Sequence, residues 1–252
     1  MKKAIAILCV ICIACALLAG CGDKTTVGGI KTRSEVQSTE LQFTGVKDGD
    51  TVAVIHTTMG DIWVVLYPDY APMAVDNFVG LAQKGYYNNN LVTRVAKDFL
   101  VQAGDATNTG LAGETVWGNT PFPIEVTDKL HHYAGALCMS QDTPGAGNLS
   151  QFYIISADSK AVDDTMVKAL QDAGYSESVI NTYKDAGGAP YLDYQYTVFG
   201  QVFDGIDVVD AINAAELDEN ARPLTAITIT GIESGVYPFT PAADSSAEST
   251  AP

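Results

Sequence analysis

The stretch from Arg94 to Asp105 combines residue types that could act together on a substrate. Arg94 is followed by two large apolar residues, Phe99 and Leu100, and then by Gln102. In a strand, residues an even number apart share a face, so Leu100 and Gln102 can point the same way, and Arg94 joins them if the chain between loops back. A cation, an amide and an apolar floor could hold a neutral, partly apolar substrate and polarise it. The set contains no nucleophile, general base or metal ligand, and that absence limits the chemistry open to it.

Composition excludes one large class of partner. The chain has 252 residues, enough for one sizeable core or two small ones, and 47% of them are apolar. The formal net charge is −16, whereas nucleic-acid binding requires clustered lysines and arginines that meet phosphates. We therefore expect no nucleic-acid partner and attribute the acidity to solubility. A monomer is the default expectation.

The N-terminus has the pattern of a targeting segment. Two lysines precede an apolar run over residues 4–18, which is short for a membrane span of about 20 residues. The run ends in Leu18-Ala19-Gly20-Cys21, which resembles the lipobox of bacterial lipoproteins. That resemblance implies a signal peptide over 1–20, cleavage before Cys21, lipidation of Cys21, and anchoring at the outer face of the bacterial cytoplasmic membrane. An uncleaved anchor or an ordinary secretory signal is the alternative.

The cysteines contain a misleading metal-site pattern. Cys9, Cys12 and Cys15 have a spacing found in metal and iron–sulfur sites, but they lie inside the apolar run that cleavage removes. The mature chain would keep Cys21, blocked by lipid, and Cys138. No internal disulfide is then possible, and we expect Cys138 to be a buried structural thiol. We expect no metal and no other cofactor.

Composition also divides the mature chain into three parts. Residues 21–46 are rich in Thr, Ser, Gly and charge, which predicts a flexible tether. Residues 47–236 carry the regular apolar patterns and form the folded domain. Residues 237–252 form a tail of Pro, Ala, Ser and Glu that we expect to be disordered.

The stretch that begins at Arg94 needs neighbouring elements to hold it in place. Strand patterns at 51–57 and 61–67, with a short turn between them, predict a hairpin. A helix should follow from Pro72 until Gly85 stops it. Further strands are expected at 91–95, 99–102, 134–140, 151–156, 197–202 and 226–232, and a second helix at 207–214. Many short strands with two helices indicate a closed barrel capped by helices.

One segment departs from the β pattern. Residues 161–186 have helical periodicity, with an apolar face that includes Leu170 and ends near Gly174. Ser176 can cap a second helix. The pattern predicts a helical hairpin, inserted between two strands over residues 159–190.

Several short blocks occur in an order that is typical of one enzyme family. They are Met59-Gly60-Asp61-Ile62, Val75-Asp76-Asn77-Phe78, Gly85-Tyr86-Tyr87, the stretch from Arg94 to Asp105, Ser150-Gln151-Phe152-Tyr153-Ile154 and Thr197-Val198-Phe199-Gly200. Over residues 51–232 this ordered set resembles the cyclophilins, which are peptidyl-prolyl cis–trans isomerases. The resemblance implies a mainly β fold, a closed antiparallel eight-stranded cyclophilin-like barrel capped by two helices, with the helical hairpin inserted.

The resemblance also implies residue roles. Arg94 and Gln102 correspond to the family's catalytic arginine and to the glutamine beside it. Substrate-binding positions are Phe99, Leu100, Ser140, Gln141, Gln151, Tyr153, Tyr191, Leu192 and Tyr196. Because the helical insert lies just before Tyr191, we expect it to overhang the substrate groove or its rim.

The function implied by the resemblance is isomerisation of prolyl peptide bonds in proline-containing polypeptides. With the lipid anchor, this predicts an enzyme that assists the folding of exported proteins at the cell envelope. The alternative is a non-catalytic cyclophilin module that captures proline-containing segments, or that binds a partner through its insert.

Overall fold

The computed structural model describes residues 35–141 and 145–242. The predicted signal peptide at 1–20 and the predicted lipid attachment at Cys21 lie outside the described residues. Within the described ranges, no helix has the length and apolar character needed to cross a membrane.

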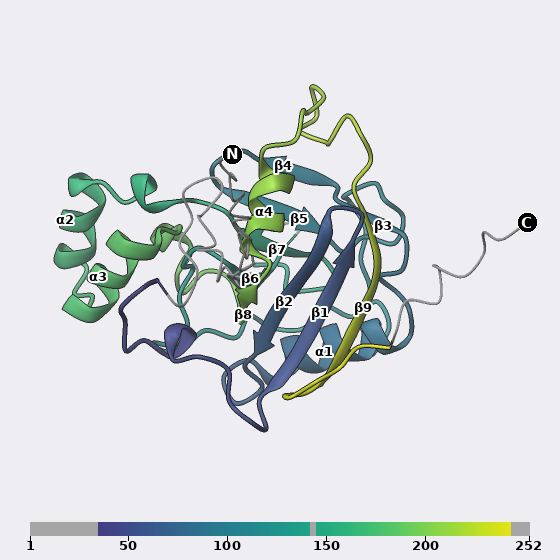
Figure 1. The fold of residues 1–252 in the computed structure, drawn as a ribbon, viewed down its shortest axis with the longest axis horizontal. Coiled ribbons are helices and arrows are strands. Elements are labelled where there is room, and N and C mark those ends of the chain that lie inside the picture. The colour runs from purple at the N-terminus through teal and green to yellow at the C-terminus, as the bar shows by residue number, and fades with distance from the viewer. Residues whose placement is uncertain (1–34, 142–144, 243–252) are drawn as a thin grey trace, which may run out of the picture.

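A curled antiparallel sheet forms the body of the domain (Figure 1). Its strands are β1 (Thr51–Thr57), β2 (Gly60–Leu66), β3 (Asn90–Leu91), β4 (Arg94–Ala96), β5 (Leu100–Ala103), β6 (Ala136–Met139), β7 (Phe152–Ile155), β8 (Val198–Asp204) and β9 (Thr228–Val236). They are hydrogen-bonded in the order β3-β9-β1-β2-β8-β6-β7-β5-β4. β1 and β2 form the predicted hairpin, with Thr57 opposite Gly60 at the turn.

The closed eight-stranded barrel that we expected is not confirmed. The described strands form a nine-stranded sheet with β3 and β4 at its two ends, and no ladder between β3 and β4 is present among them. The two end strands are instead joined by the chain itself, through Val92 and Thr93. The Val92 amide donates to Ile227 beside one end, and the Thr93 amide donates to Gln102 beside the other. The sheet thus curls on itself without a ladder that joins its ends.

Helices α1 (Pro72–Gln83) and α4 (Ile206–Asn213) bury their apolar faces in one core with the sheet. Phe78 of α1 lies at the centre of this core, with its ring centroid 5.4 Å from that of Phe152 and 5.3 Å from that of Phe199. Pro72 opens α1, and no side chain of the preceding residue caps it. The cap comes instead from Glu125, whose carboxylate accepts hydrogen bonds from the amides of Met73 and Ala74.

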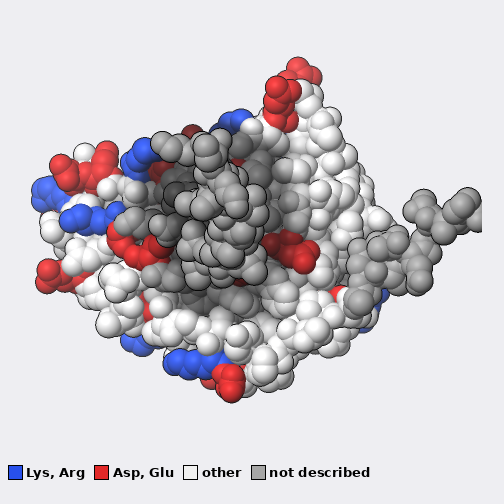
Figure 2. Space-filling model, viewed as in Figure 1, with Lys and Arg blue, Asp and Glu red and all other residues white. Residues whose placement is uncertain are grey.

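The predicted helical hairpin is present. It consists of α2 (Asp164–Asp172) and α3 (Glu177–Ala186), and it projects from one side of the sheet (Figure 1). Ser176 caps α3 as expected, by accepting a hydrogen bond from the amide of Val179. Positive and negative side chains lie close together along its outer edge (Figure 2), among them the pair Lys168 and Asp172 at 2.9 Å.

The last residues of the predicted tether pack against the domain. Val36 and Phe43 are buried in a cluster with apolar residues of the hairpin. Gln42 is fully buried, and its amide donates to the carbonyl of His131 and to the side chain of Gln201. This part of the predicted tether therefore belongs to the packed structure, because its few apolar and amide side chains find partners there.

Cys138 on β6 is a buried, free thiol, as the sequence predicted. Burial raises the pKa of this thiol well above its usual value. It belongs to the second apolar cluster of the domain, which also contains Leu100 and Tyr153.

Candidate active site

Strand pairing brings Arg94 and Gln102 together. β4 and β5 are antiparallel neighbours, and their register places Arg94 directly opposite Gln102 and Ala96 opposite Leu100. Directly opposed residues share a face of the sheet. The chain between the two strands therefore loops back and brings Arg94 to the same face as Leu100 and Gln102. The alternate residues Val95 and Val101 point into the core and are buried. Arg94 is exposed and Gln102 is partly buried, so the cation and the amide both reach the surface.

These two side chains lie at the edge of a cavity of about 480 Å³. We call it the Arg94 cavity. Its lining residues are Arg94, Phe99, Leu100, Gln102, Gly110, Leu111, Ser140, Gln141, Tyr153, Tyr191, Leu192 and Tyr196. The cavity brings together every predicted site residue within the described ranges except Gln151. The resemblance could not identify Gly110 and Leu111, because they lie in a loop outside the quoted blocks.

Gln151 lies directly behind Gln102. It is almost fully buried, and its side-chain oxygen accepts a hydrogen bond of 2.9 Å from the side-chain nitrogen of Gln102. Its own nitrogen donates to the carbonyl of Ala112 at 3.1 Å. The structure therefore places Gln151 where it orients Gln102 and holds the loop that carries Leu111, rather than on the cavity wall.

The apolar side of the Arg94 cavity consists mainly of the aromatic rings of Phe99, Tyr153 and Tyr191, together with Leu100. Leu100 and Tyr153 are buried at 5% and 4% exposure and form its floor. The Tyr191 ring stands 5.9 Å from that of Phe99 and is 53% exposed, which places it at the rim. Burial raises the pKa of the Tyr153 hydroxyl well above its usual value, so this wall stays uncharged. An uncharged, ring-lined hollow suits a compact apolar group.

Asp105 organises the opposite rim, a role beyond the simple turn that its sequence context indicates. Its buried carboxylate accepts hydrogen bonds from the amides of Gly110, Leu111 and Ala112. Burial raises the pKa of this carboxyl, but hydrogen bonds from the loop more than offset that effect and lower the pKa to about 2. The signal for this role is the Asp105-to-Gly110 segment itself, where one aspartate precedes several Thr, Asn and Gly residues.

A second hollow of about 510 Å³ is polar and shares Arg94, Gln102 and Gly110 with the Arg94 cavity. Its lining includes Thr93, Asp218 and Arg222. The Arg222 guanidinium donates to the carbonyl of Thr109, next to the residues that line the Arg94 cavity. Arg94 therefore lines both hollows.

The arrangement can bind and polarise a substrate, and the pair of Arg94 and Gln102 itself contains no nucleophile. A guanidinium is charged at any working pH and presents donors in a fixed plane. The amide of Gln102 lies on the same face of the sheet, and the apolar hollow begins beside both. Within the described ranges, no three or more His, Cys, Asp or Glu side chains gather as a metal-binding group.

Comparisons with known proteins agree on one family. The family model described as cyclophilin type peptidyl-prolyl cis-trans isomerase/CLD matches residues 52–234. A Staphylococcus saprophyticus protein assigned to the peptidyl-prolyl cis–trans isomerases is 38% identical over 190 residues, covering 75% of this chain and 94% of its own length. A Staphylococcus aureus protein with the same assignment is 36% identical over 188 residues, covering 75% of this chain and 93% of its own length.

Solved structures agree with the sequence matches. A cyclophilin type peptidyl-prolyl cis-trans isomerase of Cryptosporidium parvum superposes with a TM-score of 0.57 and 27% identity, covering 73% of this chain and 96% of its own. A structure of the same description, solved in the presence of the dipeptide Ala-Pro, gives a TM-score of 0.56 and 28% identity, with 72% and 96% coverage.

Proposed function

This chain belongs to the cyclophilin-type peptidyl-prolyl cis–trans isomerase family, and from that membership we propose that the Arg94 cavity is its active site. The proposal rests on one observation above the rest. Arg94 and Gln102 are paired by strand register, and both line a cavity whose other side consists of aromatic rings and Leu100. The Ala-Pro dipeptide present with the Cryptosporidium parvum structure supports a proline-containing ligand for this chain too.

The reaction explains why a cation suffices without a nucleophile. Rotation about a peptide bond faces a barrier of about 18–20 kcal/mol, which arises from the partial double bond between carbon and nitrogen. At the transition state the bond is twisted, the resonance is lost, and the proline nitrogen becomes pyramidal and basic. A guanidinium that donates to this nitrogen stabilises the twisted state more than either planar state, and such differential binding lowers the barrier.

The other groups divide the remaining work. The ring-lined side of the cavity, with Leu100 and Tyr153 as its floor, holds the proline ring. Gln102 holds the substrate carbonyl or orients Arg94, and Gln151 fixes the amide of Gln102 from behind. The bond then rotates against a fixed ring while its nitrogen faces Arg94.

The test of this assignment is Arg94→Ala. We expect kcat/KM for a proline peptide in a protease-coupled assay to fall by about 100-fold or more, the usual loss when a charge-stabilising donor is removed. Lys97→Ala is the matched control, because Lys97 is an exposed cation in the turn that follows β4 and lines neither hollow. A loss below about tenfold for Arg94→Ala, with the control unchanged, would show that catalysis lies elsewhere.

We propose in addition that the enzyme works at the cell envelope. The sequence supports this through the basic start, the apolar run and the lipobox-like residues that end at Cys21. A lipid on Cys21 would hold the domain at the outer face of the cytoplasmic membrane. Its substrates would then be exported chains that emerge unfolded, with their prolyl bonds accessible.

A further inference from the structure

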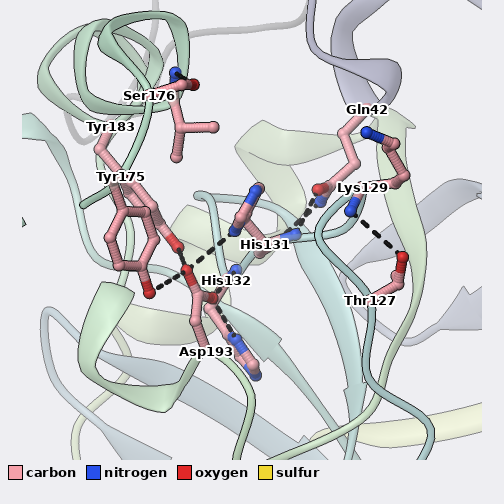
Figure 3. Close-up of polar contacts among 10 residues, drawn as sticks. Gln42, Thr127, Lys129, His131, His132, Tyr175, Ser176, Tyr183 and Asp193 are labelled. Atoms are coloured by element: carbon pink, nitrogen blue, oxygen red, sulfur yellow. Dashed lines mark hydrogen bonds and ion pairs between the residues drawn. The ribbon is translucent and has the colours of Figure 1, made fainter. Parts of the chain in front are cut away.

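The carboxylate of Asp193 is the centre of a buried polar cluster (Figure 3). The side chain of His131 donates to it at 3.0 Å. His132 donates to it twice, from its backbone amide and from its ring, both at 2.8 Å. A buried carboxylate is costly unless donors surround it, so these contacts hold its position closely.

The helical hairpin supplies the remaining donors. The hydroxyl of Tyr183 on α3 donates to Asp193 at 2.8 Å, and the hydroxyl of Tyr175, between α2 and α3, donates at 3.3 Å. Asp193 thereby receives five hydrogen bonds, of which two come from the hairpin. We call Asp193 with His131, His132, Tyr175 and Tyr183 the Asp193 cluster.

The Asp193 cluster reaches one wall of the cavity through the chain. Asp193 directly follows the 3₁₀ turn Pro190–Leu192, and its amide donates back to the carbonyl of Pro190 at 3.1 Å. Two residues of this turn, Tyr191 and Leu192, line the Arg94 cavity. Fixing the Asp193 carboxylate therefore fixes the turn that carries this wall.

The same cluster reaches a second wall through ring packing. The His132 ring lies parallel to that of Tyr153, with centroids 6.3 Å apart and an angle of 19° between the planes. Tyr153 belongs to the floor of the Arg94 cavity. One carboxylate is thus linked to two sides of the cavity, by the chain on one side and by stacked rings on the other.

The hairpin is anchored where it returns to the sheet. The amide of Ala189 donates to the carbonyl of His132 at 2.8 Å. Gly188 passes so close that an added Cβ would stand 2.3 Å from this carbonyl and 2.8 Å from the Tyr183 ring. No hairpin residue within the described ranges lines the Arg94 cavity, and whether the insert overhangs the groove or its rim stays a prediction. The hairpin is linked to the site through the bonds of Tyr175 and Tyr183 to Asp193.

We propose that Asp193 is a positioning residue of the isomerase and that the hairpin braces the proline-binding walls through Tyr175 and Tyr183. The inference rests on the assignment of the Arg94 cavity as the active site. A wall that grips the proline ring contacts the planar and twisted states alike. Loosening such a wall weakens substrate binding more than it slows the isomerisation of bound substrate. It therefore raises KM and leaves kcat nearly unchanged.

The experiment replaces both hairpin hydroxyls and keeps both rings. In the double variant Tyr175→Phe and Tyr183→Phe, we expect KM for a cis-proline peptide to rise roughly fivefold. This rise is smaller than the one expected if the whole free energy of a hydrogen bond to a charged group were lost from substrate binding. We expect kcat to stay within about twofold of wild type. Phenylalanine preserves the apolar packing of α3, so the variant folds, and circular dichroism with a melting curve checks this.

Thr182→Val is the matched control. Thr182 is a buried hydroxyl on α3 that bonds to Ser38 and to the carbonyl of Ser178, and it does not contact Asp193. We expect its KM and kcat to equal those of wild type, even where its melting temperature falls. An equal rise of KM in this control would mean that general loosening of the hairpin is responsible, and it would overturn the role of Asp193.

The outcomes separate this inference from the proposed function. Wild-type KM and kcat in the double variant, together with lost activity in Arg94→Ala, would overturn the brace and keep the site. Retained activity in Arg94→Ala would overturn the site itself. A fall of kcat with unchanged KM in the double variant would also contradict the brace, because it would mean that the hairpin acts on the twisted state alone.

Discussion

The position of Arg94 depends on the register of two short strands. In β4 and β5, which pair Arg94 with Gln102, a slip by one residue would turn every side chain to the other face. Arg94 would then point into the core, and Val95 would face the cavity. The buried side chains of Val95 and Val101 prevent this slip, since each would lose its place in the apolar core. Catalytic geometry at this residue is therefore secured by two valines.

The buried contact between His132 and Asp193 makes the free energy of unfolding depend on pH. Burial lowers the pKa of His132 below its usual 6.5, although the Asp193 charge opposes that effect. Below pH 6.5 the unfolded chain takes up a proton at this histidine that the folded chain resists, so stability falls as the pH falls. We expect the free energy of unfolding to drop by up to about 1.4 kcal/mol per pH unit for this proton. Urea unfolding between pH 8 and pH 5 measures it.

His132→Asn is the control for this pH dependence. The asparagine amide can donate to Asp193 from nearly the place of the histidine ring nitrogen, but it does not titrate. Its stability should therefore change less with pH between 6.5 and 5 than that of wild type. The same slope in both proteins would assign the dependence to other groups. A separate loss occurs in more acid solution, because hydrogen bonds from the histidines outweigh burial and lower the pKa of Asp193 to about 2.

The sequence predicted the cavity residues far better than it predicted the Asp193 cluster. Arg94 and the residues around it are local in the chain and match known family blocks. Asp193 and His132 are 61 positions apart. The sequence around a histidine does not indicate which distant carboxylate it will contact in the folded protein. Gln151 shows the intermediate case, since its block was identified but its place behind Gln102 depends on the pairing of β5 with β7.

At the scale of elements, local signals determined the helices and long-range contacts determined their setting. Pro72 and Ser176 mark the starts of α1 and α3 as expected. The carboxylate that caps α1 belongs to Glu125, about which the helix sequence carries no information. The sequence likewise could not predict whether the sheet closes into a barrel. Closure depends on whether β3 and β4 pair with each other, and both strands are very short.

Helix α4 carries Asp210, whose surroundings disfavour the charged form of its carboxyl group. Burial, with the nearby charges of Asp207 and Asp158, raises the pKa of Asp210 to about 7. A raised carboxyl pKa means that stability is lost as the pH rises from about 4 to about 7, because in this window the unfolded chain ionises and the folded chain does not. We expect Asp210→Asn to stabilise the protein at pH 8 by roughly 2 kcal/mol, seen as a melting temperature several degrees higher.

The pH itself provides the control for α4. At pH 5 the Asp210 carboxyl is protonated in the folded protein and resembles the asparagine amide in shape. The stabilisation by Asp210→Asn should therefore shrink strongly between pH 8 and pH 5. A gain of equal size at both pH values would show that the substitution acts through packing and not through the buried charge.

At the scale of the whole molecule, the net charge bears on which surfaces the protein can bind. The net charge of −16 disfavours binding to anionic surfaces, so electrostatics alone would not hold the domain at a membrane. The lipid proposed for Cys21 would supply that attachment. The hairpin lies at one side of the domain (Figure 1), and none of its described residues lines the Arg94 cavity.

The anchoring proposal predicts a specific loss in Cys21→Ser. We expect the wild-type protein to incorporate labelled palmitate in cells and to enter the detergent phase on phase separation. The variant should do neither, because serine has no thiol to acylate. Isomerase activity of the variant should equal that of wild type, since Cys21 is distant in sequence from the domain. Labelled palmitate in the variant would refute attachment at this cysteine.

The buried thiol of Cys138 gives the enzyme chemical durability. A thiolate is the form that oxidants and alkylating reagents attack, and burial keeps this sulfur protonated and out of their reach. The described fold contains no disulfide whose reduction could weaken it. We therefore expect isomerase activity to be the same under oxidising and reducing conditions.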